Sequence, residues 1–361
     1  MSGWQQCLLG QVVTLQRGFD ITQAQQTHGK YSVVSSSGIK SYHDEFQVKG
    51  PGVVIGRKGT LGSVFYLADD FWPHDTTLWV RDFHGNVPLF VFYYLQSYDL
   101  GAYDVGSSNP TLNRNHVHLL RACIPEPKEQ RAIAAVLDSL DEKIKFLNRQ
   151  NKTLEATADT LFRQWFIAAP QTGWEDRPLS SVASFLNGLA CQKYPPDNAL
   201  ERLPVLKIRE LSSGISDTSD WATDKVKPEY IVKAGDVIFA WSASLMVKVW
   251  DGARCVLNQH LFKVTSDKFP KWFYLMWCKH HLAEFIAISA SHATTMGHIK
   301  RSDLDAAMVL VPSPLELETM SAQMSPLLEK QIALAEQIKT LEALRNILLP
   351  KLMSGEVRVA C

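Results

Sequence analysis

Residues 133–165 read IAAVLDSLDEKIKFLNRQNKTLEATADTLFRQW, and one series of positions in this stretch is separated by alternating steps of four and three. The series is Ile133, Leu137, Leu140, Ile144, Leu147, Asn151, Leu154, Ala158, Leu161 and Trp165. Such steps define the narrow seam of a coiled coil, whereas a helix packed on a broad globular core has a wider apolar stripe. The stretch therefore predicts one helix of a coiled coil.

The same series occurs again near the end of the chain. Its members, each 187 residues after their counterparts (320 − 133 = 187), are Met320, Met324, Leu327, Gln331, Leu334, Ile338, Leu341, Arg345, Leu348 and Leu352. Asn151 and Gln331 place polar groups on the seam, where such residues lower stability but fix the pairing. We expect the coiled-coil core to consist of Leu140, Ile144, Leu147, Asn151 and Leu154 with Leu327, Gln331, Leu334, Ile338 and Leu341.

Pro326 predicts a break in the second helical block, because proline inside a helix costs about 3 kcal/mol. Ser325-Pro326 is typical of an N-cap followed by a first helical residue, and Asp138-Ser139 lies at the matching place in the first block. We expect a short helix, a break and a long helix in each block. Antiparallel pairing of the long helices from residue 139 would span roughly 40 Å, close to one turn of B-DNA at about 34–36 Å.

The duplication extends beyond the helices. Trp4, Leu9, Val12 and Gly18 recur as Trp174, Leu179, Val182 and Gly188 (174 − 4 = 170), and Ile124-Pro125-Glu126-Pro127 recurs as Val311-Pro312-Ser313-Pro314. A duplicated chain has approximate two-fold symmetry and can contact two places on a pseudo-two-fold partner such as DNA.

Four blocks follow from this repeat: mixed segments at 1–124 and 170–311, and helical segments at 125–169 and 312–361. Short β-like runs at 52–55 and 236–239 and helical runs at 89–96 and 272–279 fall within the mixed segments. We interpret the aromatic residues of those helical runs as core rather than as base-stacking residues. The predicted fold class is α+β, with two pseudo-symmetric mixed α/β domains separated by an antiparallel two-helix coiled coil.

The composition is that of an ordinary soluble globular protein of two or three domains, with 46% hydrophobic and 20% charged residues in 361. Thirty-seven basic residues balance thirty-seven acidic ones, so no overall field attracts nucleic acid and local patches would have to do so. Six scattered cysteines without a CxxC pair argue against a zinc ribbon and suit free thiols. No secretory signal or membrane-spanning run is visible, and we expect a cytoplasmic protein.

Catalytic motifs are absent from the sequence. It contains no GxGxxG, GxxxxGK[ST], HExxH or amino-methyltransferase Asn-Pro-Pro motif. Asp104 with Glu126 and Lys128 imitates a nuclease pattern, but the last two fall in a proline-rich hinge. The histidines show no metal-ligand spacing. We therefore predict no catalytic residue, no metal site and no cofactor bound by this chain.

The segment Gly56-Arg57-Lys58-Gly59-Thr60-Leu61-Gly62-Ser63 is a glycine-rich loop with two adjacent cations. Glycines let a backbone approach phosphates, and arginine can form a bidentate contact with guanine. The equivalent loop, Ala240-Trp241-Ser242-Ala243-Ser244-Leu245, has no cation, as expected if each copy reads a different sequence. An ordinary solvated turn is the alternative.

Asn109 and Arg114 precede the first helical block, and Lys300 and Arg301 precede the second. Gln259 and His260 match Asp75 and Thr76 by position. The predicted DNA-binding residues are Arg57, Lys58, Thr60, Asn109 and Arg114 in the first copy and Trp241, Ser242, Gln259, His260, Lys300 and Arg301 in the second.

Several strings resemble the specificity subunits of type I restriction–modification systems. Ile124–Gln130 followed by Ile133-Ala134, and Leu161–Phe166, are similar to the central conserved region of that family. Leu348–Val357 is similar to its C-terminal conserved region, and Gly56–Gly59 to a loop in many of its target recognition domains. The second copy departs from the pattern at Leu315-Glu316-Leu317, where the first has Lys128-Glu129-Gln130.

The resemblance implies a non-catalytic subunit that selects DNA. Two target recognition domains would each read one half of an asymmetric bipartite site, and the coiled coil would set the gap between the halves. The helical regions would dock two modification subunits, which carry S-adenosylmethionine and methylate adenine. Restriction subunits would add an ATP- and Mg-dependent nuclease.

Three alternatives stay open. One is a targeting subunit of another bipartite-site system, whose partner fuses methylation and cleavage in one chain. Another is a coiled-coil scaffold that binds proteins only. The third is an enzyme, which would have to transfer methyl groups without a partner.

Overall fold

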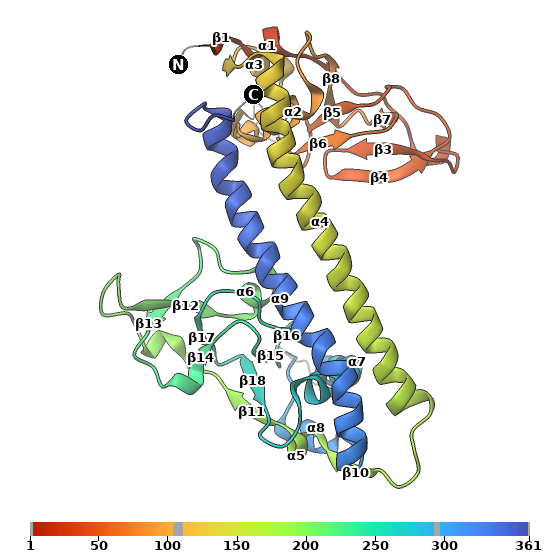
Figure 1. Ribbon diagram of the computed structural model, residues 1–361, viewed down its shortest axis with the longest axis vertical. Coiled ribbons are helices and arrows are strands. Elements are labelled where there is room, and N and C mark those ends of the chain that lie inside the picture. Colours follow the sequence, from red (N-terminus) through yellow and green to blue (C-terminus); the bar gives the residue numbers. More distant parts are fainter. Residues whose placement is uncertain (1–2, 104–110, 292–296, 360–361) are drawn as a thin grey trace. The chain divides into compact units, whose positions relative to one another are not determined.

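Two long helices and two sets of short strands make up the computed structural model (Figure 1), which describes residues 3–103, 111–291 and 297–359. The chain groups into two compact units: unit 1 contains residues 1–144 and 341–361, and unit 2 contains residues 145–340. Helices α4 (Pro127–Arg163) and α9 (Pro314–Met353) each contribute one segment to each unit. None of the helices in the described ranges is long and apolar enough to cross a membrane.

Unit 1 is built on a four-stranded antiparallel sheet in the order β2-β8-β5-β6, a three-stranded sheet β4-β3-β7 and a β1-β9 pair. Its elements besides α4 and α9 are β1 (Gln5–Leu8), α1 (Leu9–Val12), β2 (Thr14–Arg17), β3 (Tyr31–Ser35), β4 (Gly38–His43), β5 (Gly52–Gly56), β6 (Val64–Leu67), β7 (Phe71–Pro73), β8 (Thr77–Asp82), α2 (Pro88–Gln96), α3 (Arg114–His118) and β9 (Arg121–Ile124). Short 3₁₀ turns occur at Gln23–Gln25 and Leu100–Tyr103.

Unit 2 repeats this order, with sheets β11-β18-β15-β16 and β13-β12-β17-β14 and a β10-β19 pair. Its elements are β10 (Glu175–Pro178), α5 (Leu179–Val182), β11 (Ser184–Asn187), β12 (Arg202–Leu206), α6 (Ile208–Ser213), β13 (Trp221–Thr223), β14 (Ile231–Val232), β15 (Val237–Ala240), β16 (Met246–Val249), β17 (Cys255–Leu257), β18 (Leu261–Thr265), α7 (Lys271–Ser291), α8 (Arg301–Ala306) and β19 (Met308–Val311). The repeat, the predicted strands at 52–55 and 236–239 and the predicted helices at 89–96 and 272–279 are confirmed.

The repeated glycines mark a close approach of two backbone segments. A Cβ atom at Gly18 would lie 2.1 Å from the carbonyl oxygen of His74, and one at Gly188 would lie 2.2 Å from that of Asn258. In each unit the chain leaving β2 or β11 therefore touches the loop that follows β7 or β17. Only glycine permits this approach, since every other residue would place a Cβ atom inside the facing carbonyl.

The aromatic residues of α2 and α7 are core residues, as predicted. Phe90, Tyr93, Trp272 and Phe273 are each 5% exposed or less. Unit 1 buries them with Ile133, Ala134 and Leu137 of α4 and Leu352 and Met353 of α9. Unit 2 buries them with Ala158, Phe162, Met320, Met324 and Leu328. Burial of this apolar surface is the main stabilising contribution in each unit.

This packing corrects the expectation that the helices avoid a globular core. Adjacent positions such as Ile133 with Ala134 widen the apolar stripe, and Leu328, beside the predicted Leu327, is itself buried. The ends of both helices therefore belong to the domain cores. The ten predicted coiled-coil positions are buried (Ile144, Leu147, Leu334, Ile338) or half-buried (Leu140, Asn151, Leu154, Leu327, Gln331, Leu341).

Within each unit the segments of α4 and α9 run antiparallel (Figure 1). In unit 1, Asp141 of α4 pairs with Arg345 of α9, and earlier residues of α4 share a core with later residues of α9. In unit 2, residues 146–154 of α4 line a groove with Lys330 and Leu334, and residues 152–159 line a cavity with Met324 and Leu328.

The predicted break at Ser325-Pro326 is wrong. Helix α9 is continuous for 40 residues through Pro326, and Ser139 donates its hydroxyl proton to the Val136 carbonyl (2.7 Å) inside the continuous helix α4 instead of capping a new helix. Pro326 is exposed, while Met324 and Leu328 on either side are buried. Burial of these neighbours offsets the one hydrogen bond that proline removes.

The helices begin instead at the prolines of the two hinges. Proline is favoured at the first helical position, because the amide proton that it lacks would have no partner there. At the second hinge, Ser313 caps α9 in a reciprocal arrangement with Glu316. At the first hinge, the fully buried Gln130 accepts from the Val87 amide (2.9 Å) and so ties α4 to the start of α2. The second copy, which lacks the Lys128-Glu129-Gln130 string, therefore begins its helix with a serine cap in place of the Gln130 hydrogen bond.

The close approach at the repeated glycines predicts an effect on stability. Gly18→Ala and Gly188→Ala should each lower the free energy of unfolding by about 3 kcal/mol, because a Cβ would clash with rigid backbone. Gly101→Ala is the control, since a Cβ there meets nothing closer than 3.5 Å; it should change stability by less than about 0.5 kcal/mol. Urea denaturation followed by tryptophan fluorescence measures all three, and equal stabilities would contradict the predicted clash.

Candidate nucleic-acid interface

Four chain segments converge at the same place in each unit. In unit 1 they are the end of β2, the loops after β5 and β7, and the segment before α3. In unit 2 they are the end of β11, the loops after β15 and β17, and the segment before α8. Bridges join Lys58 to Thr111 in unit 1 and Ser242 to His298 in unit 2. The same backbone hydrogen bond follows each bridge, at 2.9 Å from the Leu112 amide to the Arg57 carbonyl and at 3.1 Å from the Ile299 amide to the Trp241 carbonyl. We name the matching side chains loop cluster 1 (Arg17, Arg57, Lys58, Asp75, Thr76) and loop cluster 2 (Asn187, Trp241, Ser242, Gln259, His260).

Loop cluster 1 is organised around Asp75. Its carboxylate accepts from the Arg17 guanidinium at 2.7 Å, and its carbonyl accepts from Arg57 Nη1 at 3.3 Å. The backbone amides of Arg57 and Lys58 both donate to the carbonyl of Thr76, at 2.9 and 3.0 Å. These bonds hold two guanidinium groups side by side at the ends of β2 and β5.

The pKa of Arg57 lies below its ordinary value, first because the side chain is partly buried and second because Arg17 is near, while Asp75 opposes the shift. An arginine stays charged in spite of such a shift. A positive group that is partly desolvated beside another positive group gains from an incoming anion or acceptor, since that partner would relieve the repulsion.

Glycines determine the shape of the rest of the loop after β5. Gly59 and Gly62 have φ values of +78° and +74°, in the left-handed region that favours glycine. A Cβ at Gly56 would lie 2.1 Å from the Thr60 carbonyl oxygen, so the loop is folded tightly back on the strand. Thr60 is exposed at the tip.

Loop cluster 2 is organised around Trp241. Its indole Nε1 donates to Asn187 Oδ1 at 3.2 Å, and its ring stacks on Phe262 with centroids 5.5 Å apart. The Ser242 hydroxyl lies 3.1 Å from His260 Nδ1, and Gln259 Nε2 lies 3.4 Å from His260 Nε2. The cluster presents neutral donors and acceptors on an aromatic base, where unit 1 presents guanidinium groups.

The loop of unit 2 keeps the backbone shape of the loop of unit 1 without its glycine. Ala243, which follows Ser242 as Gly59 follows Lys58, has a φ of +57°. A non-glycine residue in this region costs of order 1–3 kcal/mol and persists only where its surroundings impose it. The hydrogen bond from the Ala243 amide to the Gly297 carbonyl (2.8 Å) is one such constraint.

The remaining predicted residues lie at the starts of α3 and α8. Arg114, Lys300 and Arg301 are exposed, and Arg301 makes one long hydrogen bond, 3.5 Å, to the Phe185 carbonyl. Asn109 lies in the segment 104–110, outside the described residues. The structure thus brings Arg57 with Lys58, and Trp241 with Ser242, Gln259 and His260, into one cluster per unit. It places the helix-start cations on adjoining segments.

Sequence reasoning missed Arg17, Asn187 and the role of Asp75. Arg17 and Asn187 immediately precede the repeated glycines, so they occupy the same position in the two copies. The signal available in the sequence was a polar residue that differs between the two copies and precedes a glycine that both copies share. Its importance becomes visible only when the sheet brings the end of β2 beside the loop after β5.

One group in the described residues has the donors for a metal ion. Ligand atoms of Asp20, His74 and Asp75 all lie within 4.8 Å of one another. The Asp75 carboxylate is already bound by Arg17, and a second guanidinium, that of Arg57, lies at the Asp75 carbonyl. These cations would repel a metal ion, so the group is better explained as part of the hydrogen-bond network of loop cluster 1.

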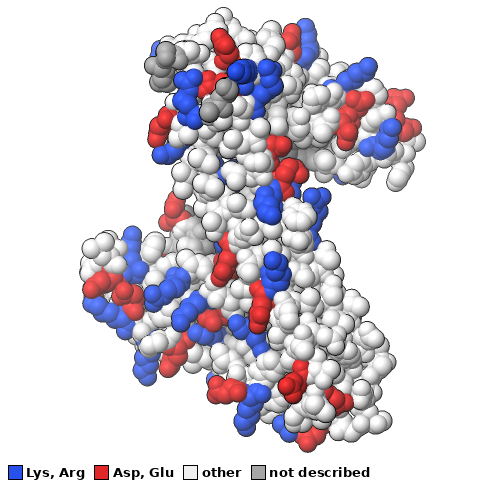
Figure 2. Space-filling view, in the orientation of Figure 1, with Lys and Arg blue, Asp and Glu red and all other residues white. Residues whose placement is uncertain are grey.

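Figure 2 shows Lys and Arg interspersed with Asp and Glu over the displayed face of the molecule. This distribution agrees with the net charge of zero. Any attraction of nucleic acid must therefore come from local groups such as Arg17 and Arg57 rather than from a field over the whole surface.

Comparison with known proteins connects this geometry to a family. A family model described as the type I restriction modification DNA specificity domain matches residues 1–156 and 171–343. The specificity subunit of the type I restriction enzyme MjaIX from Methanocaldococcus jannaschii is 25% identical over 305 residues, 76% of this chain and 70% of that protein. The specificity subunit of the HindI enzyme from Haemophilus influenzae is 18% identical over 329 residues, 69% of this chain and 71% of that protein.

A solved structure shows the same fold. The S subunit of a type I restriction–modification system from M. genitalium matches with a TM-score of 0.70 and 14% identity, covering 97% of this chain and 96% of that one. The resemblance inferred from the hinge and helix strings is confirmed. The chain belongs to the type I restriction–modification DNA specificity family and is a specificity subunit with two recognition domains.

Proposed function

We propose that each recognition domain reads one half of an asymmetric bipartite DNA site, one half through loop cluster 1 and the other through loop cluster 2. One observation carries this proposal: the two units share a backbone frame but differ in the side chains on it. The bridges Lys58–Thr111 and Ser242–His298 are equivalent, whereas Arg57 is matched by Trp241. Equivalent frames with different hydrogen-bonding groups would read different base sequences.

The chemistry of loop cluster 1 favours a guanine-containing half-site. Arginine binds the O6 and N7 acceptors of guanine in the major groove, and Arg57 and Arg17 supply two such forks. Loop cluster 2 offers Gln259, whose amide matches the N6 and N7 edge of adenine, beside the donors and acceptors of Ser242 and His260. We assign the half-buried Lys58 and the exposed Thr60, Arg114, Lys300 and Arg301 to the phosphates, which position a protein on DNA without specifying sequence.

We further propose that this chain performs no catalysis and that its helices dock two modification subunits. Those subunits would bring S-adenosylmethionine, and restriction subunits would bring the ATP- and Mg-dependent activity, in a cytoplasmic complex on chromosomal DNA. Exposed apolar side chains support docking: Phe146 of α4 is 45% exposed, and Leu344 and Ile347 of α9 are 43% and 58% exposed. Such side chains on helices favour protein contacts. Partners that share phosphate neutralisation would also explain the even charge balance.

The first test is of DNA choice. Methylated adenines sequenced across the host genome should fall in one bipartite motif, and the complex with the modification subunit should bind a duplex carrying it at least about 10³-fold more tightly than a scrambled duplex. Scrambling either half alone should also weaken binding. Equal affinity for all duplexes would refute the proposal, and methyl transfer by this chain without a partner would refute its non-catalytic role.

The two loop clusters should act on different half-sites. Arg57→Ala should remove about 1–3 kcal/mol of base discrimination in one half-site, because a bidentate contact to one base is lost. Gln259→Ala is the matched variant, and it should relax only the other half. Binding to duplexes mutated one base pair at a time measures both. If either variant weakened all duplexes equally, its residue would be a phosphate contact instead.

The helices should set the gap between the half-sites. Deleting one heptad from each, residues 144–150 and 331–337, removes about 10 Å of helix and should shorten the preferred gap by about three base pairs or abolish binding. Inserting one heptad at each place is the control and should lengthen the gap. Binding to duplexes of graded spacing reads out both variants, and an unchanged gap would contradict the role as a ruler.

A further inference from the structure

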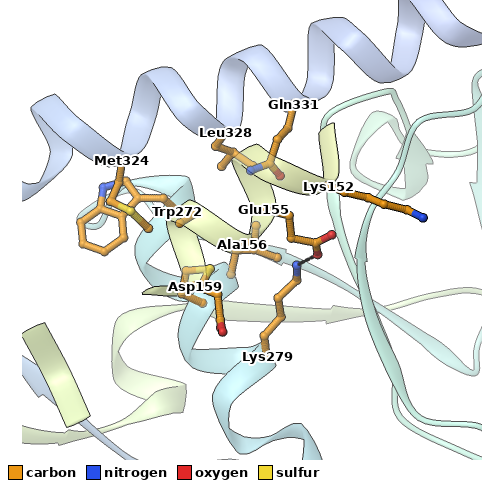
Figure 3. Close-up of a pocket in the computed structure, with 12 residues that line it drawn as sticks. Lys152, Glu155, Ala156, Asp159, Trp272, Lys279, Met324, Leu328 and Gln331 are labelled. Atoms are coloured by element: carbon orange, nitrogen blue, oxygen red, sulfur yellow. Dashed lines mark hydrogen bonds and ion pairs between the residues drawn. The ribbon is translucent and has the colours of Figure 1, made fainter. Parts of the chain in front are cut away.

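A cavity of about 410 Å³ lies among α4, α7 and α9 of unit 2 (Figure 3). Its walls include Trp272, Met276, Met324 and Leu328, each less than a tenth exposed. Charged residues of α4 and α7 surround its edge, and Figure 3 shows the ion pair between Glu155 and Lys279 there. The cavity is therefore an apolar recess with a charged rim.

The duplication identifies the residues that occupy the equivalent place in unit 1. Asp82 lies opposite Thr14, the first residue of β2, and Thr265 lies opposite Ser184, the first residue of β11. Eleven residues beyond them lie Tyr93 and Met276. The 187-residue register of the helices relates Asp141 to Leu328 and Ala158 to Arg345.

In unit 1 these three residues form a polar network. The Tyr93 hydroxyl donates to Asp141 Oδ2 at 2.8 Å, and Arg345 Nη1 lies 3.4 Å from Asp141 Oδ1. In unit 2 the corresponding residues are methionine, leucine and alanine, which cannot form this network. Ala158 of unit 2 stands where unit 1 has Arg345, so a long side chain is missing. The cavity lies where that side chain would have to fit.

A recess of this kind favours an apolar occupant. An apolar cavity offers water no hydrogen-bond partners, and leaving it empty forfeits packing contacts. Burying an apolar group there would recover them.

The rim adds a preference for negative charge. Lys279 Nζ lies 2.7 Å from Glu155 Oε1, and Arg163 Nε lies 2.8 Å from Asp159 Oδ2, so both carboxylates have cationic partners. Lys152 has no ion-pair partner within the described part of the chain, and Figure 3 shows it extending away at the edge of the cavity. An apolar group entering the recess could therefore be accompanied by a carboxylate beside Lys152.

We propose that this cavity receives one large apolar side chain of a modification subunit, with an Asp or Glu of the same segment beside Lys152. The inference rests on the proposed docking of modification subunits on the helices. In unit 1, Tyr93, Asp141 and Arg345 occupy the equivalent place. The two docking surfaces, although related by duplication, therefore differ, and only the surface of unit 2 anchors its partner in this way.

The test is to fill the cavity with a bulky side chain introduced at its rim. Ala156 is exposed and lines the cavity, so Ala156→Trp should block it without disturbing the core. Ala343, at the same register position in unit 1 and also exposed, gives the matched control Ala343→Trp. We expect Ala156→Trp to weaken binding of one of the two modification subunits at least about 10-fold. Ala343→Trp adds the same side chain beside Ile347 on the other docking surface, where no such recess is filled, and we expect it to weaken neither subunit more than about three-fold.

Lys152→Glu gives a second, independent measurement, since this exposed substitution should not affect folding. It should weaken the same subunit about three- to ten-fold at low salt, and the loss should shrink at high salt, because a rim charge is screened. Sedimentation velocity titration with the purified modification subunit gives both affinities and stoichiometry. Thermal unfolding checks that each variant is folded.

Binding by Ala156→Trp and Lys152→Glu equal to that of the wild type would overturn the cavity proposal and leave DNA choice untouched. A complex that assembles, loses one subunit in these variants and fails to discriminate duplexes would overturn the DNA proposal alone. A wild-type chain that binds no modification subunit would overturn both.

Discussion

The backbone contact at the two repeated glycines constrains the rest of each recognition domain. At Gly18 and Gly188 the chain leaving one strand lies against the carbonyl group of His74 or Asn258, closer than any side chain would allow. This contact fixes where the loop after β7 or β17 lies relative to the end of β2 or β11. Since the loop after β5 or β15 bonds to the same segment, three separate parts of the sequence are held in one cluster. A frame of backbone contacts leaves the side chains on it free to differ.

That freedom explains how one chain can carry two loop clusters of different chemistry. Arg57 and Trp241 occupy the same backbone position, yet one is held beside Asp75 and Arg17 and the other stacks on Phe262. The retained left-handed conformation at Ala243, where unit 1 has Gly59, indicates that the frame imposes its shape even at a cost in strain. Duplication thus preserved the geometry while the chemistry diverged.

The helices show the same relation between frame and chemistry. Their 187-residue register is retained from the hinge prolines to the last turn, while Tyr93, Asp141 and Arg345 of unit 1 are replaced by residues that cannot form an ion pair. The cost of removing charges from water offsets much of the attraction within a half-buried ion pair, so apolar residues can replace it in the other copy without loss of the fold. It changes the surface that a partner would meet.

The sequence alone predicts the duplication, the α+β class, the hinge positions, the long helices and their antiparallel pairing, because these features follow from the periodicity and the repeat spacing of its residues. It also identified the loops at Arg57 and Trp241. The other features depend on tertiary contacts. Pro326 lies inside a continuous helix because buried neighbours offset its lost hydrogen bond, and local propensity cannot anticipate that compensation. Arg17 and Asn187 join the loop clusters because sheet pairing brings distant strand ends together.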